Sequence, residues 1–378
     1  MSADRSFPDL SRRRLLGALS AAGLAGVLPV ARAGQRRRTI GVALVGLGHY
    51  SRDLLAPALQ MTKHCRLAGI VTGTPAKAEE WQRRYAIPER NVYDYAGFDR
   101  IADNPDIDVV YVVLPNHLHK PFTLRGAAAG KHVWCEKPMA MDAVEALAMI
   151  EACHRHRVQL AIGYRMQHEP NTQAVMALAT SRPFGRLQRV RAEAGFHGFD
   201  DANGDPWRLD PARGGGAMYD MGVYALNAAR YTTGAEPVAV TATSAVERPA
   251  IFRGVDETMR FRLEFPDGVV ADCETSFGRN LNRLRAECAD GWYELSPFQA
   301  YEGVRGDASD GRRFDAAIGA TPAQQARQMD ADALAILEGR PPRVPGEEGW
   351  RDMRALDAIF ASARAGGRRV EIAGGRVP

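Results

Sequence analysis

The run of residues 39–45 constrains the fold more than any other feature of the sequence. It is mostly apolar, it lacks polar alternation, and a glycine turn, Gly46-Leu47-Gly48, follows it directly. Such a run is typical of a parallel strand that is covered on both faces. The further strands expected on this basis lie at 66–71, 107–114 and 132–135, and the helices between them at 53–61, 76–85 and 121–129. This β-α-β alternation predicts an α/β Rossmann domain over residues 34–160.

The pattern changes beyond residue 160, where several runs alternate apolar and polar residues. Alternation indicates an antiparallel sheet with one covered face, so residues 161–378 are predicted to form an α+β domain with a large, mostly antiparallel open sheet. An open sheet face usually needs a cover, which predicts a homodimer or homotetramer. The expected strands lie at 185–196, 237–247, 257–265, 269–277 and 282–288, and the helices near 215–231, 322–338 and 347–364.

The N-terminus has the pattern of an export signal. Arg12-Arg13-Arg14 precedes an uncharged stretch at 15–30, and Ala31-Arg32-Ala33 resembles a signal-peptidase site. Residues 1–33 are therefore predicted to be a twin-arginine signal, with the translocase as a transient partner and the periplasm as the destination. The alternative is a membrane anchor, but sixteen weakly apolar residues are fewer than the roughly 20 that a span needs. No stable anchor is expected.

The charge balance argues against nucleic-acid binding. The net charge is +4, but residues 1–33 hold five arginines and two aspartates, so 44 basic and 43 acidic residues remain in the rest of the chain. A nucleic-acid-binding domain usually carries a basic excess. The nine histidines do not fall into a ligand pattern, and no metal is predicted.

The glycine turn lies between an expected strand and an expected helix, which is the context of a dinucleotide-binding fingerprint. Gly46 would form the turn and Gly48 would let the backbone approach a pyrophosphate at the helix N-terminus. The third position of the motif is Ser51, which is small enough for close packing. The alternative is a purely structural turn. The residues predicted to bind the cofactor here are Gly46, Leu47, Gly48, His49 and Tyr50.

The end of the second expected strand distinguishes NAD from NADP. NAD-binding domains usually have an acidic residue there for the ribose hydroxyls, but residues 71–77 contain no carboxylate. Thr72, Gly73 and Lys77 occupy the position where a 2′-phosphate would lie, and a lysine would pair with it. The sequence therefore favours NADP. The alternative is that Lys77 begins a helix and faces water.

Two further motifs carry reactive side chains. Glu136-Lys137-Pro138 ends the strand at 132–135, and strand ends of open α/β sheets face the ligand crevice. Three glycines, 214–216, precede a helix on which Asp220 and Tyr224 are four residues apart and share a face. Each motif has a structural alternative: Lys137 as a solvated strand end, Asp220 as a cap and Tyr224 as a core residue.

Together these motifs resemble the Gfo/Idh/MocA family of glucose–fructose oxidoreductase and inositol dehydrogenase. The shared motifs are Gly46-Leu47-Gly48, Asn116-His117-Leu118-His119 after Pro115, Glu136-Lys137-Pro138 and the segment from Gly214 to Tyr224. A tyrosine at 224, the twin-arginine signal and Gly163-Tyr164-Arg165 make the chain most similar to the glucose–fructose and aldose–aldose oxidoreductase branch. It departs from glucose–fructose oxidoreductase in having only residues 34–38 before the first strand, which argues against that enzyme's arm-based tetramer.

The resemblance implies roles for individual residues. Lys137, Asp220 and Tyr224 would surround the sugar carbon: Tyr224 would take the proton, Lys137 would favour the phenolate, and Asp220 would orient the sugar or the lysine. Further cofactor contacts are implied for Pro115, Asn116, His119, Glu136, Lys137 and Arg165. Sugar contacts are implied for Tyr164, Arg165, His168, Trp207, Arg208, Asp220 and Tyr224, with core packing as the alternative for Trp207.

The function expected from the resemblance is that of an exported NADP-dependent sugar oxidoreductase. It would oxidise an aldose at C1 to the lactone and, with NADP retained, reduce a second sugar. The alternatives are a nucleotide-dependent glycosidase of the same family, a simple NAD(P)-dependent sugar or polyol dehydrogenase, and a non-catalytic sensor of sugars or nucleotides.

Overall fold

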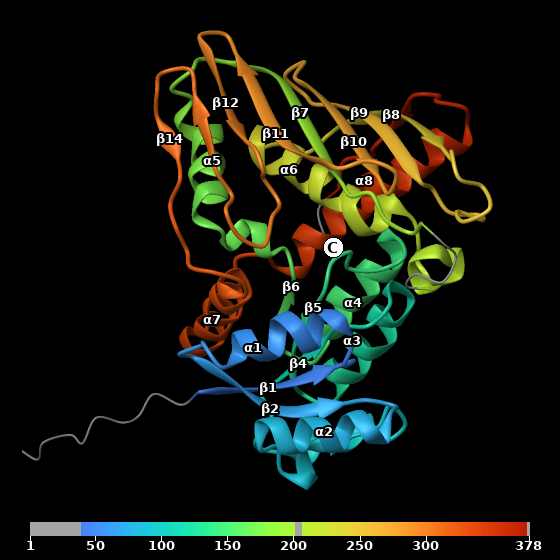
Figure 1. Ribbon diagram of the computed structural model, residues 1–378, viewed down its shortest axis with the longest axis vertical. Helices are drawn as coiled ribbons and strands as arrows, with labels where there is room; N and C mark the ends of the chain where they lie inside the picture. The colour runs from blue at the N-terminus through green and yellow to red at the C-terminus, as the bar shows by residue number, and fades with distance from the viewer. Residues whose placement is uncertain (1–38, 201–205, 376–378) are drawn as a thin grey trace, which may run out of the picture. The chain divides into compact units, whose positions relative to one another are not determined.

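The structure, a computed structural model, describes residues 39–200 and 206–375, all within one compact unit of the chain (Figure 1). The predicted signal at 1–33 and the residues at 34–38 lie outside the described residues. None of the helices within the described ranges combines the length and the apolar character needed to cross a bilayer.

The first sheet has six parallel strands in the order β3-β2-β1-β4-β5-β6. This order is that of a doubly wound dinucleotide-binding domain, so the predicted Rossmann fold is confirmed. The expected domain boundary between residues 160 and 161 falls inside the last strand. The strands are β1 Ile40–Val45, β2 Cys65–Val71, β3 Val92–Tyr93, β4 Val109–Val112, β5 His132–Cys135 and β6 Leu160–Ile162.

Helices cover both faces of this sheet because its central strands are apolar on both sides. Val42 and Leu44 belong to one buried cluster, and the alternating Ala43 and Val45 belong to another. The helices of this half are α1 Ala56–Leu59, α2 Pro75–Tyr85, α3 His119–Ala128 and α4 Ala143–Arg155. Short 3₁₀ or π turns are η1 Ser51–Leu55, η2 Glu89–Asn91, η3 Phe98–Asp103, η4 Asn116–Leu118 and η5 Arg165–His168.

The second sheet has nine strands in the order β14-β13-β12-β11-β7-β10-β9-β8-β15. Within the described residues of this sheet, only the β7–β10 pairing is parallel, which confirms a mostly antiparallel sheet. Sequence analysis located the first five strands but missed the short ones that follow. The strands are β7 Leu187–Gly195, β8 Ala239–Ala245, β9 Thr258–Glu264, β10 Val270–Ser276, β11 Leu281–Cys288, β12 Gly291–Leu295, β13 Gly306–Ala308, β14 Arg313–Phe314 and β15 Val370–Glu371.

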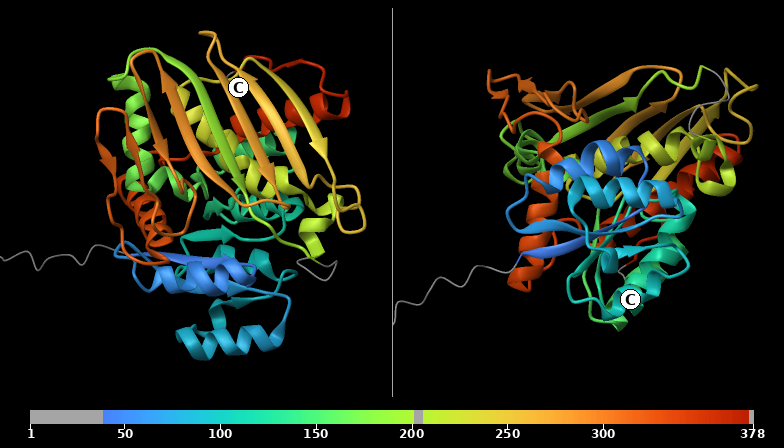
Figure 2. Two further views of the ribbon diagram at one scale, coloured as in Figure 1. Left: turned by 45° about the horizontal axis from the view of Figure 1, so that its top comes forward. Right: turned by 60° about the horizontal axis from the view of Figure 1, so that its bottom comes forward.

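Helices α5, α6 and α8 lie on one side of the second sheet in both figures (Figures 1 and 2). The other face carries cross-strand ion pairs, such as Asp272 between Arg189 and Arg262. Sequence analysis did not predict α5. The remaining helices and turns are α5 Pro170–Ser181, η6 Pro206–Leu209, η7 Pro211–Arg213, η8 Met218–Gly222, α6 Val223–Thr233, α7 Ala323–Glu338 and α8 Gly346–Arg364.

Helix α7 packs on the first sheet although it follows strands β7 to β14 of the second sheet in the sequence. Ala326, Met329 and Ala333 join the buried cluster that contains Val42 and Leu44. The C-terminal part of the chain therefore completes the cover of the Rossmann sheet. This position brings α7 next to the strand ends where ligands bind in such folds.

A buried ion-pair network joins α6 to α8 beneath the second sheet. Arg230 is 3% exposed, and its guanidinium contacts Asp352 at 2.5 Å and Glu348 at 3.0 Å. Asp352 is fully buried and also accepts a hydrogen bond from Asn227 at 2.9 Å. Removing one member of such a buried network leaves the others unpaired.

We therefore expect Arg230→Ala to lower the free energy of unfolding by about 3–5 kcal/mol. The matched control is Arg369→Ala, because Arg369 pairs with Glu264 at the surface and such pairs contribute about 1 kcal/mol or less. Urea unfolding of both variants measures the difference. Equal losses would contradict the importance of the α6–α8 network.

Candidate functional site

The glycine turn after β1 has the geometry that a dinucleotide site requires. Gly46 has φ of +95°, and a Cβ there would lie 2.4 Å from the Val113 carbonyl oxygen, so only glycine fits. A Cβ at Gly48 would meet no atom within 4 Å, which leaves the backbone approachable. The buried Ser51 hydroxyl donates a hydrogen bond to the Gly46 carbonyl at 2.6 Å and holds the turn against the following helix.

The first turn of α2, shortly after β2, places the exposed Lys77 next to the glycine turn. Lys77 Nζ donates a hydrogen bond to the Leu47 carbonyl at 3.4 Å, so its side chain points back to the turn. Thr72 is buried, and its hydroxyl accepts a hydrogen bond from the Thr74 amide at 3.3 Å. With no carboxylate in residues 72–78, the turn, the helix N-termini and Lys77 fit a dinucleotide that carries a 2′-phosphate.

His49 and Tyr50, also predicted to bind the cofactor, begin the helix that follows the turn. His49 is exposed, and its Nδ1 lies 2.5 Å from an Asp53 carboxylate oxygen. Tyr50 is half-buried, and its ring centroid lies 6.4 Å from that of Tyr301. Tyr50 therefore extends from the glycine turn toward residues of the second half of the chain.

The structure brings Lys137, Asp220 and Arg208 together from three separate segments. Lys137 Nζ donates to the Asp220 carbonyl oxygen at 2.6 Å and lies 3.3 Å from its carboxylate. Arg208 Nε donates to the other carboxylate oxygen at 2.9 Å. The side chains of Lys137 and Asp220 are 11% and 13% exposed, so the pair is nearly enclosed.

Neighbouring groups keep both members of this enclosed pair charged. Although burial acts in the opposite direction, the Arg208 and Lys137 cations lower the pKa of the Asp220 carboxyl to about 2. Burial also opposes the Lys137 charge, but Tyr224 and Asp220 raise the pKa of the ammonium above its usual range. Ionised Asp220 therefore stabilises the fold above its ordinary pKa of 3.8, and this contribution is lost as the pH falls through about 2.

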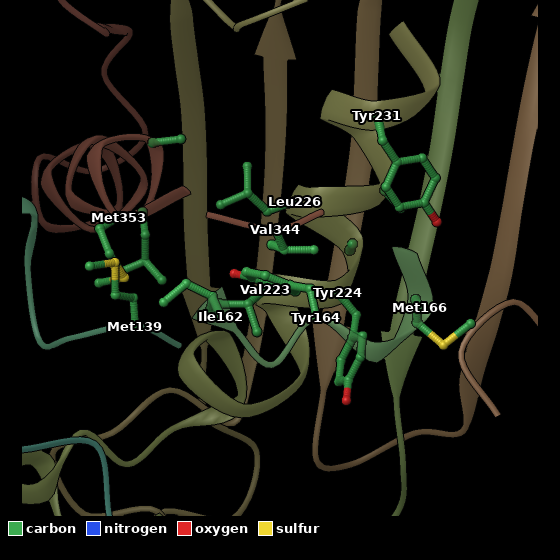
Figure 3. Close-up of a cluster of buried hydrophobic side chains, with 14 of the residues drawn as sticks. Met139, Ile162, Tyr164, Met166, Val223, Tyr224, Leu226, Tyr231, Val344 and Met353 are labelled. Atoms are coloured by element: carbon green, nitrogen blue, oxygen red, sulfur yellow. The ribbon is translucent and has the colours of Figure 1, made fainter. Parts of the chain in front are cut away.

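Tyr224 lies beside the lysine. Lys137 Nζ is 4.6 Å from the centroid of the Tyr224 ring, and Arg165 Cζ is 5.4 Å from it. Figure 3 shows the Tyr224 hydroxyl pointing out of the apolar cluster that holds Leu226 and Val344. Asp220 on η8 and Tyr224 on α6 thus both lie next to Lys137, as their four-residue spacing predicted.

The glycines before Asp220 make close contact with protein atoms. A Cβ at Gly214 would lie 2.7 Å from the Asn116 Cβ, and one at Gly215 would lie 2.6 Å from the Arg208 carbonyl oxygen. Asn116 is buried and donates a hydrogen bond to the Gly214 carbonyl at 2.7 Å. These glycines let the segment that carries Asp220 pack against Asn116, directly after Pro115 at the end of the third expected strand.

Arg165 is buried and donates hydrogen bonds to several residues of the second half of the chain. It is 2% exposed and donates to the carbonyl oxygens of Gln299 at 2.6 Å and Ala300 at 3.0 Å, and to the Gln324 side chain. Its Cζ lies 4.5 Å from the Tyr301 ring. Tyr301 and Gln324 were not predicted as site residues, because Tyr301 lies in an irregular segment, Gln324 lies in an expected helix, and neither belongs to a motif.

Three other predicted site residues face the protein interior. The two ring nitrogens of buried His119 lie 2.8 Å from the Pro138 and Leu114 carbonyl oxygens. Burial, with Arg343 and Arg327 nearby, lowers the pKa of His168 to about 3. Tyr164 is buried, and burial and the Asp352 carboxylate raise the pKa of its phenol. All three side chains are thus enclosed by protein atoms.

Trp207 and Glu136 occupy different surroundings. Trp207 is half-buried, and Arg208 Cζ lies 4.4 Å from its ring. Glu136 is buried and accepts a hydrogen bond from the Tyr111 hydroxyl at 2.6 Å.

Within the described residues, no three His, Cys, Asp or Glu side chains are grouped to hold a metal ion.

Comparison with known proteins identifies both halves of the chain. A family model described as an oxidoreductase family with an NAD-binding Rossmann fold matches residues 40–164, and the Gfo/Idh/MocA C-terminal domain model matches residues 172–294. D-xylose 1-dehydrogenase (NADP(+)) 2 of Haloferax volcanii is 32% identical over 315 residues, which cover 82% of this chain and 93% of that protein.

Two further relatives agree with this match. D-xylose 1-dehydrogenase [NADP(+)] of Haloarcula marismortui is 28% identical over 336 residues, 85% of this chain and 90% of that protein. The crystal structure of aldose–aldose oxidoreductase from Caulobacter crescentus, in complex with glycerol, has 40% identity and a TM-score of 0.83. The match covers 88% of this chain and 100% of that one.

The two glycines of the first turn should respond differently to alanine. We expect Gly46→Ala to lower the melting temperature, because the side chain would be strained at positive φ and would collide with Val113. Gly48→Ala should leave the melting temperature nearly unchanged but weaken nucleotide binding, since its methyl group would enter the open space. Thermal unfolding and calorimetric titration with nucleotide test this. Undiminished binding by Gly48→Ala would contradict the assignment.

Proposed function

Because the chain belongs to the Gfo/Idh/MocA oxidoreductase family, we propose that it oxidises an aldose at C1 to the lactone with NADP as the hydride acceptor. The observation that carries the proposal is the enclosed group of Lys137, Asp220 and Tyr224. It lies where β5 ends, at the edge at which open α/β sheets bind ligands. Xylose dehydrogenase and aldose–aldose oxidoreductase among the relatives support a sugar as the substrate.

The side chains divide the chemistry between them. Oxidised nicotinamide supplies a hydride acceptor for C1 of the sugar when it is bound. Tyr224 takes the O1 proton as the C1–O1 bond gains double-bond character. Lys137 places a fixed positive charge 4.6 Å from the phenol ring, where it stabilises the developing negative charge.

Asp220 holds this arrangement in place. Its carboxylate binds both Lys137 and Arg208, so it fixes the ammonium beside Tyr224. The raised pKa of Lys137 keeps the lysine protonated, and Lys137 then acts through its charge while Tyr224 moves the proton. Arg208 pairs with Asp220, Trp207 lies against Arg208, and both are proposed to contact the sugar.

NADP is favoured over NAD by the end of β2. Lys77 reaches the glycine turn, and no carboxylate in residues 72–78 would repel a 2′-phosphate. The two xylose dehydrogenase relatives carry NADP(+) in their names, which supports the same coenzyme. Retention of NADP and reduction of a second sugar are proposed from the aldose–aldose oxidoreductase relative and from the twin-arginine pattern at residues 1–33.

Tyr224→Phe tests the proposed base. We expect the turnover of aldose to fall by about 10²–10⁴, the usual contribution of a general base, while bound nucleotide is retained. The matched control is Tyr219→Phe, since Tyr219 lies on adjacent η8 and its hydroxyl donates to the Met141 carbonyl at 2.6 Å. Steady-state assays of both variants provide the readout. Full activity in Tyr224→Phe would contradict the role of Tyr224 as the base, and absence of aldose turnover by the unmodified protein would favour a sensor.

Replacement of Arg12 and Arg13 by lysine tests the proposed route of export. We expect the double variant to accumulate in the cytoplasm at the size of the precursor, whereas the unmodified protein reaches the periplasm. Cell fractionation measures the distribution. The nucleotide released by denaturing the periplasmic protein should be NADP. Export of the double variant would refute this route, and a nucleotide-free periplasmic protein would refute cofactor retention.

A further inference from the structure

Glu136 is a buried carboxylate that the mechanism above does not use. It is 8% exposed, and the hydroxyl of fully buried Tyr111 donates a hydrogen bond to its Oε1 at 2.6 Å. Gln328 on α7 donates in turn to the Tyr111 hydroxyl at 3.2 Å. A Cβ at Gly163 would lie 2.6 Å from the same carboxylate oxygen, so glycine leaves room for the Glu136 side chain.

The charges of the site show what this carboxylate can do. Asp220 pairs with the Lys137 ammonium and the Arg208 guanidinium. Arg165, a third cation, donates its hydrogen bonds to uncharged oxygen atoms of residues 299, 300 and 324. The site therefore contains three cations and two carboxylates. Without Glu136, Asp220 would be the one carboxylate left to balance them.

Several charged or titratable groups face Glu136 from the surrounding elements. The Lys137 and Arg165 cations favour its ionised form, and Tyr111 donates to it. Tyr50 and Cys135 also lie within its electrostatic reach. Burial raises the pKa of the Glu136 carboxyl, and the Tyr111 hydrogen bond and the two cations oppose this effect. The Tyr111 hydrogen bond thus favours the ionised form, together with the two cations.

We propose that Glu136 is the counter-charge that sets the balance between oxidised and reduced nucleotide in this site, and that Tyr111 is the positioning residue that keeps it ionised. The proposal rests on the proposed use of NADP. The oxidised nicotinamide ring carries a positive charge that the reduced ring lacks. A buried carboxylate among three cations therefore favours the oxidised form over the reduced form.

This balance matters for an enzyme that both oxidises and reduces sugars with one retained nucleotide. A site with three cations and Asp220 as the one carboxylate would carry an excess of positive charge and would hold NADPH too strongly in comparison with NADP⁺. The second half-reaction would then be unfavourable, since it must return the nucleotide to the oxidised form. Glu136 lies next to Lys137 at the end of β5, and its negative charge offsets the preference for NADPH.

Glu136→Gln tests the counter-charge without any sugar. Purified protein loaded with NADP is titrated against a redox buffer of known potential, and bound NADPH is measured by its absorbance. We expect the equilibrium between the bound forms to shift about tenfold toward NADPH, the order expected when one charge leaves a buried site. An unchanged equilibrium would overturn the proposal. Wild-type protein that binds neither form would instead overturn the proposed function, and this inference with it.

Tyr111→Phe provides a second test that leaves the carboxylate in place. Loss of the hydroxyl raises the pKa of Glu136 further, so the shift toward NADPH should appear at low pH and disappear as the pH rises and Glu136 ionises. Tyr93→Phe is the matched control, because Tyr93 is a buried sheet tyrosine that accepts a hydrogen bond from Asn104 at 2.8 Å. A Tyr111→Phe protein that matches wild type at every pH would overturn the role of Tyr111.

Discussion

The ion pair between Lys137 and Asp220 is the interaction on which the site depends. It joins the end of a Rossmann strand to a segment that lies 83 residues further along the chain. Neither charge would be stable in this enclosed position alone, because burial disfavours both ionised forms. Together, and with Arg208 on the second carboxylate oxygen, they remain charged and hold the lysine against Tyr224.

Glycines allow the two halves to approach each other closely enough for this pair. Gly46 turns the chain at the end of β1, and Gly214 and Gly215 let the segment before Asp220 contact Asn116 and the backbone of Arg208. Helix α7 also holds residues near the site, since Gln324 accepts a hydrogen bond from Arg165 and Gln328 donates one to Tyr111. The reactive side chains are thus held by a scaffold that extends across most of the described chain.

The sequence predicted the parts of the site that depend on local patterns. Continuous apolar runs predicted four of the six parallel strands, without the short β3 and β6, and a four-residue spacing predicted that Asp220 and Tyr224 share a face. It did not predict that His119 and His168 are buried, because a histidine motif does not show which way the ring points. The packing of α7 on the first sheet and the partners of Arg165 were also missed. Both depend on contacts between residues more than a hundred positions apart, which periodicity does not encode.

The proposed function requires that NADP stays bound in one enclosed site and accepts hydride there from an aldose. The most direct measurement is the NADPH absorbance of protein isolated from the periplasm when an aldose is added without external nucleotide. We expect the absorbance to rise by the equivalent of no more than one NADPH per site. It should return to its starting value when a second sugar is supplied. No rise without added NADP, together with continuous turnover in its presence, would contradict the account and indicate an ordinary dehydrogenase.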